Sequence, residues 1–491
     1  MGFSTWRNSN GTYNRCSVLP VKVSSPRFTV PRRQLGCMLA RFHRVGAGAV
    51  IGIVVGLLAA SHAGGQEPPR PGSPGSPGTT TEQQPTPATA APTTPVPTPI
   101  APMAAYPIEL VGLLAPPAQR GPFTLLPSIS VSEEYNDNVH GDNRNREWDF
   151  ITNISPAISL SVNRPSYQLN AGYTFSAAIY ARGTLPNEAF QSQNFIGSGS
   201  WHTTRTLTLS LSDAFVYNKA NSNTVAVQGF SVGQQESLSN TLTPGMSWQM
   251  NAANTLNLGA TYGLLRFLGG GNGQDSDTYG INVGLTHALT QRLSGNIGYG
   301  FTYIHFLGGC TVVRNQCINE PDSTTHTPTI GFSYQLTPTL STNINGGAAV
   351  TQRSGHTDVS PAGSASLVQL LSFGSARLDY NQGVSVAGGF GGSNNTLSVS
   401  GLLTINTLLR NLLVVGGPTY SRSDPLFSQA GQSEIWSVSL DLRAIYRITP
   451  LFSAFGSYSF FIQRSGGPSN ADVDQNRVRF GLQVGYPFNF D

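Results

Sequence analysis

Charged residues spaced two apart within alternating segments are the most suggestive chemical groups in the sequence. Side chains of a strand alternate between its two faces, so this spacing places both charges of a pair on one face. On a wet face they could select ions in a channel, or they could form salt bridges that hold the wall rigid; neither interpretation is favoured. An excess of Arg would favour anionic cargo. The residues are Arg377, Asp379, Asp441, Arg443, Arg447, Arg477 and Arg479.

Catalytic motifs fail on their context. Gly229 to Gly233 (GFSVG) has the spacing of a nucleophile elbow but lies in a long loop rather than between a strand and a helix. The eight His residues show no zinc spacing, and the glycine runs lack the Lys of a phosphate loop. Glu133 and Glu134 fit interfacial or pore-mouth charges better than an acid/base pair. We therefore expect no enzyme, no metal and no cofactor.

The cysteines indicate an oxidising compartment. Cys16 and Cys37 precede the expected cleavage site described below, whereas Cys310 and Cys317 lie close together in one loop (CTVVRNQC). A disulfide between these two is the expected pairing in an extracytoplasmic protein. A metal pair is the alternative, but the nearest His, His305, lies in the preceding strand.

The composition excludes an ordinary cytosolic enzyme. Of the 491 residues only 11% are charged, against about 25% in soluble domains. The abundant Gly, Tyr and Phe favour turns and aromatic strands. The net charge of +4 comes from residues 1–44, which hold eight basic and no acidic residues. The remainder is net acidic, so no nucleic-acid partner is expected.

Residues 1–63 form an N-terminal extension with a signal peptide. A basic flank, an apolar run from Val45 to Ala60 and a small-residue site ending at Ala63 are typical of secretion. A retained single-span anchor is the alternative, but it needs about 20 apolar residues. The segment before Met38 is too polar for a signal peptide, so Met38 is a second candidate start.

Residues 64–126 form a linker rich in Pro, Thr and Ala. With almost no aromatic or charged residues it cannot bury enough surface to offset the entropy of ordering, so we expect it to be extended or disordered in the periplasm.

From residue 127 to residue 491 the sequence repeats one theme of alternating segments of about ten residues with one apolar and one polar face. The clearest segments are 155–162, 168–179, 206–211, 256–262, 279–285, 293–303, 397–405 and 436–442. Short turns alternate with nine longer loops, which predicts an all-β transmembrane antiparallel barrel of about 18 strands (range about 16–18). A soluble β-sandwich would instead bury the apolar face in a shared core.

The last strand carries the most specific pattern. Gln483, Gly485, Phe488 and Phe490 fit the polar-x-Gly-x-x-aromatic-x-aromatic pattern that is similar to the outer-membrane assembly signal. Two features depart from it, because Asp491 follows the terminal Phe and Pro487 interrupts the strand. The pattern predicts recognition by the barrel assembly machinery; an ordinary edge strand is the alternative.

The stretch from Ser128 to Asp149, and above all Glu134 to Val139 (EYNDNV), resembles the opening hairpin of an outer-membrane β-barrel porin family found near exopolysaccharide and exosortase loci in Gram-negative bacteria. The resemblance implies an outer-membrane exit pore for a polysaccharide, working with a periplasmic polysaccharide-export protein. No catalytic residue follows from it, and the Pro-rich linker is not a hallmark of the family.

Three functional hypotheses follow. The leading one is a passive outer-membrane conduit for a secreted exopolysaccharide, surrounded by outer-membrane lipid. The second is a general or solute-specific diffusion porin. The third is a structural or surface-interaction barrel whose lumen is plugged by its loops.

Overall fold

The computed structural model describes residues 122–219, 230, 235–268, 274–307, 310–313, 316–319, 321–386, 392–406, 409–427, 434–466 and 472–490. The chain divides into two units, Met1–Ala88 and Thr89–Asp491, and all described residues belong to the second. The expected signal peptide and nearly all of the expected linker lie outside the described residues.

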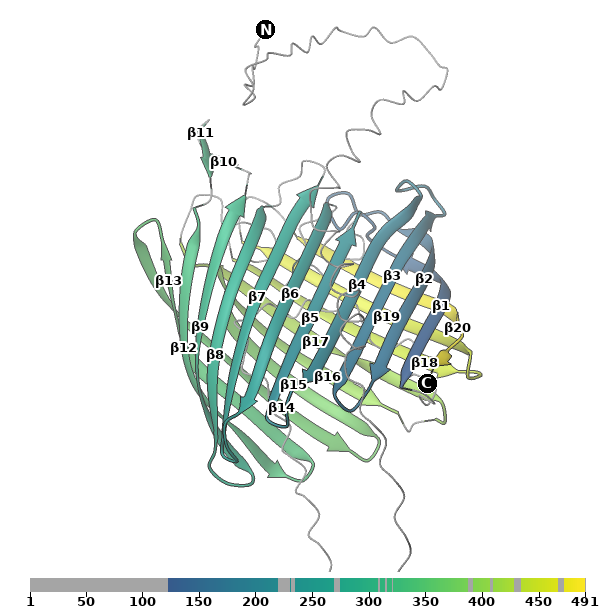
Figure 1. The fold of residues 1–491 in the computed structure, drawn as a ribbon. Coiled ribbons are helices and arrows are strands. Elements are labelled where there is room, and N and C mark those ends of the chain that lie inside the picture. The colour runs from purple at the N-terminus through teal and green to yellow at the C-terminus, as the bar shows by residue number, and fades with distance from the viewer. Residues whose placement is uncertain are drawn as a thin grey trace, which may run out of the picture. The chain divides into compact units, whose positions relative to one another are not determined.

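The described chain is built from antiparallel strands (Figure 1). The wall strands are β1 (Phe123–Asn136), β2 (Asp149–Asn163), β3 (Tyr167–Tyr180), β4 (Glu188–His202), β5 (Leu207–Asn218), β6 (Glu236–Gln249), β7 (Asn254–Leu268), β8 (Asp275–Ala288), β9 (Leu293–Leu307), β12 (Ser323–Thr337), β13 (Leu340–Arg353), β14 (His356–Leu371), β15 (Gly374–Ser385), β16 (Asn394–Ile405), β17 (Leu412–Pro425), β18 (Ile435–Arg447), β19 (Phe452–Ser465), β20 (Val473–Gly485) and β21 (Phe488–Phe490). Among the described residues, no helix is long and apolar enough to cross a membrane.

The sheet closes on itself. β1 pairs with β2 on one side and with β20 on the other, from Ser128 opposite Gly485 to Asn136 opposite Arg477. β21 continues the pairing along β1, and Pro487 lies in the break between β20 and β21, where its missing N–H costs no ladder bond. The result is a closed antiparallel barrel of 18 strands plus the short β21, which confirms the expected fold.

The first strand begins earlier than expected. Phe123 to Leu126 were assigned to the linker from their composition, but they are the first residues of β1. Phe123 pairs with Val162 and Phe490, and its ring lies 5.3 Å from that of Phe490. The alternation in this stretch is too short to be recognised without the partner strands.

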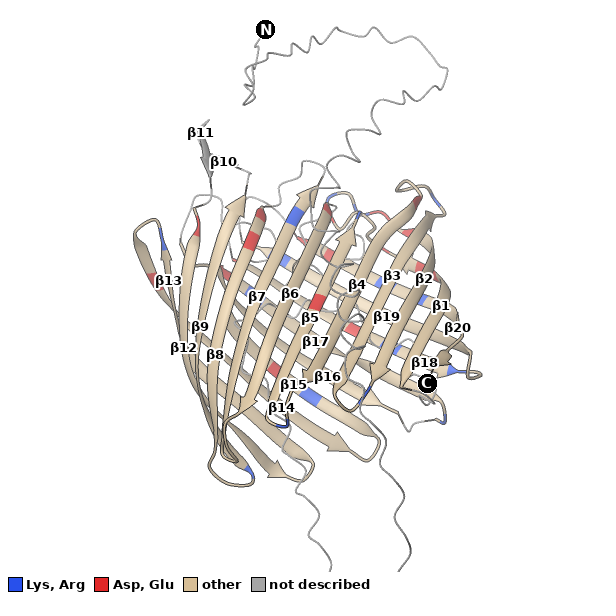
Figure 2. Cartoon of the chain, in the orientation of Figure 1, with Lys and Arg blue, Asp and Glu red and all other residues tan. Residues whose placement is uncertain are grey.

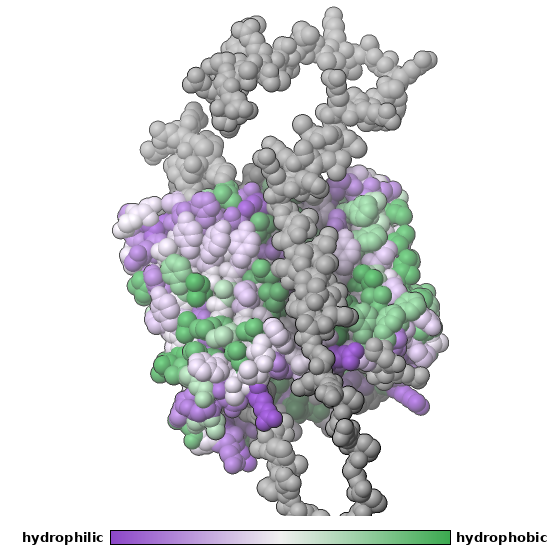
Figure 3. Space-filling model, viewed as in Figure 1, coloured by the Kyte–Doolittle hydropathy of each residue, from purple (hydrophilic) through white to green (hydrophobic). Residues whose placement is uncertain are grey.

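The two faces of the wall differ as the alternation predicts. Leu378 and Phe480 are 52% and 66% exposed on the outer face, whereas inward-facing Asp379 is only 9% exposed. In Figure 3, hydrophobic residues lie between more hydrophilic residues at the two ends. Closure pairs every strand edge, which a hydrocarbon environment demands. A closed barrel with an apolar outer band is an outer-membrane architecture.

Turns and loops alternate along the wall, with two differences from expectation. The segment 352–357, one of the nine longer loops expected from the sequence, is instead a tight turn of Ser354 and Gly355 between β13 and β14. Both residues have positive φ (47° and 79°), as the favoured hairpin turns require. The turn at Ser372 and Phe373 between β14 and β15 had no recognisable signal, because neither residue is a strong turn former.

A separate hairpin, β10 (Cys310–Val313) and β11 (Gln316–Asn319), follows β9. Its backbone register places Cys310 opposite Asn319 and Val312 opposite Cys317. The side chains of both cysteines lie outside the described residues, so the disulfide stays a prediction.

Candidate functional site: a charged stripe on the inner wall

The inner face of the barrel is uncharged over most of its circumference. From β2 to β14, away from the two rims, the described inward positions hold mainly Ser, Thr, Asn and Gly, and none is charged. Apart from rim residues of β2 to β14 such as Arg353, the inward charges of the described strands lie on β15, β18, β20 and β1, and we call these the charged stripe. It consists of Glu134 of β1, Arg377 and Asp379 of β15, Asp441, Arg443 and Arg447 of β18, and Arg477 and Arg479 of β20.

Strand register aligns most of the stripe into two neighbouring rows. Residues directly opposite in an antiparallel pair lie about 5 Å apart, and positions two residues along a strand lie about 7 Å apart. One row runs Arg443, Ser457, Arg479, Glu134, and the next runs Asp441, Ser459, Arg477, Asn136. The chain ends are therefore what bring Glu134 beside the arginines, since β1 meets β20 only on closure.

The pair of Arg479 and Glu134 joins the two ends of the barrel. Arg479 donates from Nε to Glu134 Oε2 at 2.8 Å, and its Nη2 donates to the same oxygen. The Glu134 side chain is only 2% exposed, so the carboxylate depends on this pairing.

Arg443 and Arg377 differ in their contacts and in their exposure. The Arg443 guanidinium lies 5.2 Å from the centroid of the Phe455 ring, and the residue is buried in the inner wall. Arg377 donates from Nε to Asp379 at 2.6 Å but keeps about half of its side chain exposed. The stripe thus combines internally paired charges with a guanidinium held against an aromatic ring.

All seven charged residues singled out from the sequence occupy inward positions, as parity predicts. Their outward neighbours Leu378, Leu442 and Phe480 are exposed. Sequence reasoning missed Glu134 as the partner of Arg479, because nothing local links residues so far apart in the chain. Glu133 and Glu134 also separate: Glu133 accepts a hydrogen bond from Thr152 at 2.8 Å on the outer face.

The segment Glu134 to Val139 seals the seam between the first and last strands. Asn136 and Asn138 are fully buried. Asn138 donates from Nδ2 to the Asp474 carbonyl at 2.9 Å. Gln475 donates from Nε2 to Asn136 Oδ1 at 3.1 Å and to the Asn138 carbonyl at 2.8 Å. The polar composition of this segment is therefore explained by barrel closure.

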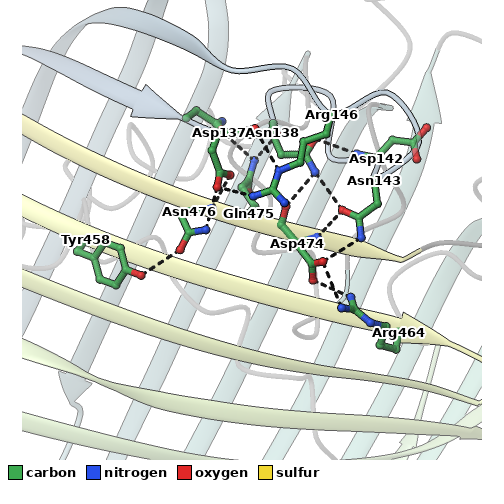
Figure 4. Close-up of polar contacts among 11 residues, drawn as sticks. Asp137, Asn138, Asp142, Asn143, Arg146, Tyr458, Arg464, Asp474, Gln475 and Asn476 are labelled. Carbon is green, nitrogen blue, oxygen red and sulfur yellow. Dashed lines mark hydrogen bonds and ion pairs between the residues drawn. The ribbon is translucent and has the colours of Figure 1, made fainter.

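Ion pairs continue the seam at the rim (Figure 4). Asp137 accepts from Arg146 Nη2 at 2.5 Å and from the backbone and side chain of Asn476 at 2.8 Å. Asp474 accepts from Arg464 Nη1 at 2.7 Å and from Asn143 Nδ2 at 3.2 Å. The first loop is thus tied to the last hairpin.

Residues of several loops contact one another at the end of the barrel where the first loop meets the last hairpin. Phe230, between β5 and β6, is fully buried and packs against Ile435 at the start of β18, a strand that does not neighbour β5 or β6. Ser393 and Ser323 share a hydrogen bond of 2.6 Å between the approach to β16 and the start of β12. These contacts therefore connect strands that are not neighbours in the wall.

Asp322 organises the rim before β12. It accepts hydrogen bonds from the Tyr303 hydroxyl at 2.6 Å and the Phe306 amide at 3.2 Å, and His305 Nδ1 lies 2.9 Å from it. Burial tends to raise the pKa of Asp322, but the hydrogen bonds from Tyr303, His305 and Phe306 outweigh it and lower the pKa. Tyr303 and His305 are nearly stacked, with ring centroids 6.3 Å apart.

The other candidates do not assemble. Within the residues that the structure describes, no three His, Cys, Asp or Glu side chains are grouped as metal ligands. Of the GFSVG segment only Phe230 is described. His140 contacts Glu147 at 3.5 Å in the first loop, and His326 contacts the Tyr299 hydroxyl at 2.7 Å on the outer face of the wall, so these two histidines do not share a site.

The final strand shows the expected alternation. Gln483 is buried on the inner side, with Gly485 also turned inward, whereas Phe488 and Phe490 are exposed outward. The Tyr486 and Phe488 rings pack edge to face, 5.0 Å apart. Recognition of these residues by the assembly machinery stays a prediction.

No family model matches the chain, and no curated protein matches it. The expected family is thus supported only as far as an outer-membrane barrel.

Among solved structures, OpdQ of Pseudomonas aeruginosa is 10% identical over 74% of this chain and 99% of that chain, with a TM-score of 0.39. OccAB4 of Acinetobacter baumannii is 11% identical, with 76% and 99% covered and a TM-score of 0.39. OprD of P. aeruginosa is 10% identical, with 74% and 96% covered and a TM-score of 0.35. At such TM-scores no function follows from these likenesses.

Proposed function

We propose that this protein is an outer-membrane channel through which small hydrophilic solutes diffuse, with selectivity set by the charged stripe. One observation carries the proposal: a closed 18-stranded wall that is apolar outside and lined inside by hydroxyl, amide and charged side chains. Barrels of about 16–18 strands are wide enough to hold an aqueous passage.

Diffusion of small solutes fits the mouth better than export of a polymer. The buried contact of Phe230 with Ile435 and the hydrogen bond of Ser323 with Ser393 join non-adjacent strands above the inner wall. A polysaccharide chain would have to displace these contacts. The exopolysaccharide conduit, which the sequence suggested first, has no support in the fold or in the comparisons.

The composition of the charged stripe favours anions. Five of its eight members are Arg and three are carboxylates. Away from the rims, the described inward positions of the opposite wall are uncharged, so they do not balance the positive excess. In a confined space of low effective dielectric such an asymmetry favours the entry of negatively charged solutes.

The test is conductance of the refolded full-length chain in planar bilayers under a KCl gradient. We expect stable openings whose reversal potential has the sign of a channel that prefers chloride over potassium. Arg443→Gln should shift this potential towards zero, whereas Arg422→Gln, on the outer face at the rim, should leave it unchanged. A barrel that never conducts would contradict the channel and favour the plugged structural barrel. A conducting barrel indifferent to Arg443→Gln would contradict only the role of the stripe.

A further inference from the structure

An acidic residue lies on the outer face of the barrel, away from both rims. Asp213 is the one acidic residue of β5, near the middle of the strand (Figure 2). It pairs with Gly197 of β4 and Leu242 of β6, and the adjacent pair on the same face is Phe195 with Phe215. Trp201 of β4 and Trp248 of β6 are exposed on this face. Asp213 therefore points outward, where hydrocarbon is expected.

Asp213 has a polar neighbour on the same face. Asn240 of β6 donates from Nδ2 to Asp213 Oδ1 at 2.7 Å. The same nitrogen lies 3.4 Å from the Ala214 carbonyl. The pair therefore places a carboxylate and an amide side by side in the outer band.

Facing lipid, such a pair is costly. Ionisable groups are rare in the bilayer interior, and they usually face protein or water rather than acyl chains. One internal amide bond does not replace the hydration of a carboxylate. The described Arg–Asp pairs of the outer face, such as Arg266 with Asp277 and Arg464 with Asp474, lie near the ends of their strands.

The surface beside Asp213 permits close approach. Gly197 and Gly199 of β4 face outward next to it, since they pair with Asp213 and Leu211. A Cβ on Gly197 would lie 3.0 Å from the Phe195 ring, so this ring covers Gly197. At Gly199 the atom nearest to an added Cβ is 3.5 Å away, on Leu169, so the backbone that can be approached is at Gly199. Small residues at membrane-embedded contacts let backbones approach and polar side chains bond across the interface.

We propose that the outer face of β4, β5 and β6 around Asp213 and Asn240 is the contact surface for a second copy of this chain, related by a two-fold axis. The pair is self-complementary, because Asn240 of each copy can donate to Asp213 of the other. A two-fold contact places the amide donor and the carboxylate acceptor of each copy opposite those of the other within one patch. No Lys or Arg of the described outer face lies midway along a strand, so no other described face offers a cation at this depth.

Cysteine cross-linking of the full-length chain in lipid nanodiscs tests this surface. Leu242→Cys places a thiol opposite Asp213, and Leu378→Cys places one on the outer face of β15, far around the wall. After oxidation, the fraction of cross-linked dimer should be well above that of the parent chain, which has only its native cysteines, for the Leu242→Cys variant. Leu378→Cys should remain at the parent level. Equal cross-linking of both variants, or none above the parent, would overturn the proposal.

Mass measurement by light scattering in mild detergent gives a second, independent readout. The parent should have the mass of two chains, and Asp213→Leu and Asn240→Leu should each lower the dimer fraction several-fold. The matched control is Gln382→Leu, which removes a polar group from the outer face of β15, where Gln382 accepts from Tyr380 at 2.5 Å. A single-chain or three-chain mass for the parent would overturn the two-fold contact. So would a dimer fraction that neither Asp213→Leu nor Asn240→Leu changes.

Discussion

Among single residues, Glu134 is the carboxylate most dependent on one partner. Its side chain is 2% exposed and its described partner is Arg479 on the last full strand. A buried pair adds little compared with apolar residues of the same shape, but removing one member leaves a charge without compensation. Closure of the barrel is therefore sensitive to either member of the pair.

Arg479→Leu should destabilise the folded barrel by about 3 kcal/mol, because it leaves the Glu134 carboxylate buried and unpaired. The loss should appear as a lower urea concentration at the midpoint of unfolding. The folded fraction at each urea concentration can be measured from the different gel mobilities of the folded and the heat-unfolded barrel. Arg422→Leu is the control, since Arg422 and its partner Asp424 are both nearly half exposed, and its loss should leave the urea midpoint nearly unchanged. Adding Glu134→Gln to Arg479→Leu should recover most of the loss; no recovery would contradict the assigned cause.

The lowered pKa of Asp322 predicts local acid sensitivity at the rim. A carboxyl with a folded pKa below its ordinary value of 3.8 contributes stability above that value. The contribution is lost as the pH falls through the lower folded pKa. Exchange protection of the Phe306 amide, which donates to Asp322, should thus decline below about pH 4. Asp322→Asn should lower the protection at neutral pH, and an unchanged amide would refute the coupling.

Among the elements, the hairpin of β13 and β14 shows how a turn decides strand length. Because Ser354 and Gly355 both adopt positive φ, the strands remain paired up to Arg353 and His356. The long-loop interpretation of this segment was wrong, since the Ser-Gly turn is local chemistry that resembles ordinary loop composition.

Gly355→Ala should therefore destabilise the barrel by about 1 kcal/mol, the usual cost of a Cβ in the left-handed region. Nothing lies within 4 Å of the added Cβ, so the effect would be conformational and not steric. Gly346→Ala is the matched control, because Gly346 also has free space but no positive φ. Urea midpoints of the two variants should differ; equal midpoints would show that backbone strain at Gly355 is negligible.

For the whole barrel, two asymmetries bear on the proposed channel. The charged stripe occupies one side of the inner wall, and loop residues at one end connect non-adjacent strands through contacts such as Phe230 with Ile435. In the proposed channel, the first would set which solutes are favoured, and the second would set how large they can be. Both require strands that are distant in the sequence to face one lumen.

Phe230→Ala should raise single-channel conductance measurably, because the removed ring is fully buried against Ile435 at the mouth. Ile435→Ala should act in the same direction, and the double variant should add little, since both remove one contact. Phe190→Ala, an exposed position of β4, serves as the control without effect on conductance. If both mouth variants conduct like the parent, the contact does not limit the passage.

The sequence by itself determined the class of the fold, the approximate number of strands and the face on which each charge lies. These follow from the period-two alternation, which is a local property of the chain. The inward positions of Arg443 and Arg479 could be predicted from the alternation along their strands alone. The tertiary structure decided which charges meet, because Glu134 reaches Arg479 only through pairing of the first and last strands.

The contacts made by the loops could not be predicted from the sequence either. The burial of Phe230 against Ile435 depends on where the loops come to rest over the barrel, and no periodicity encodes that. The lipid-side position of Asp213 could be read from parity in the Leu207 to Tyr217 segment. Its hydrogen bond to Asn240, however, needed the register of β5 against β6, which is fixed by the turns and by the wall as a whole.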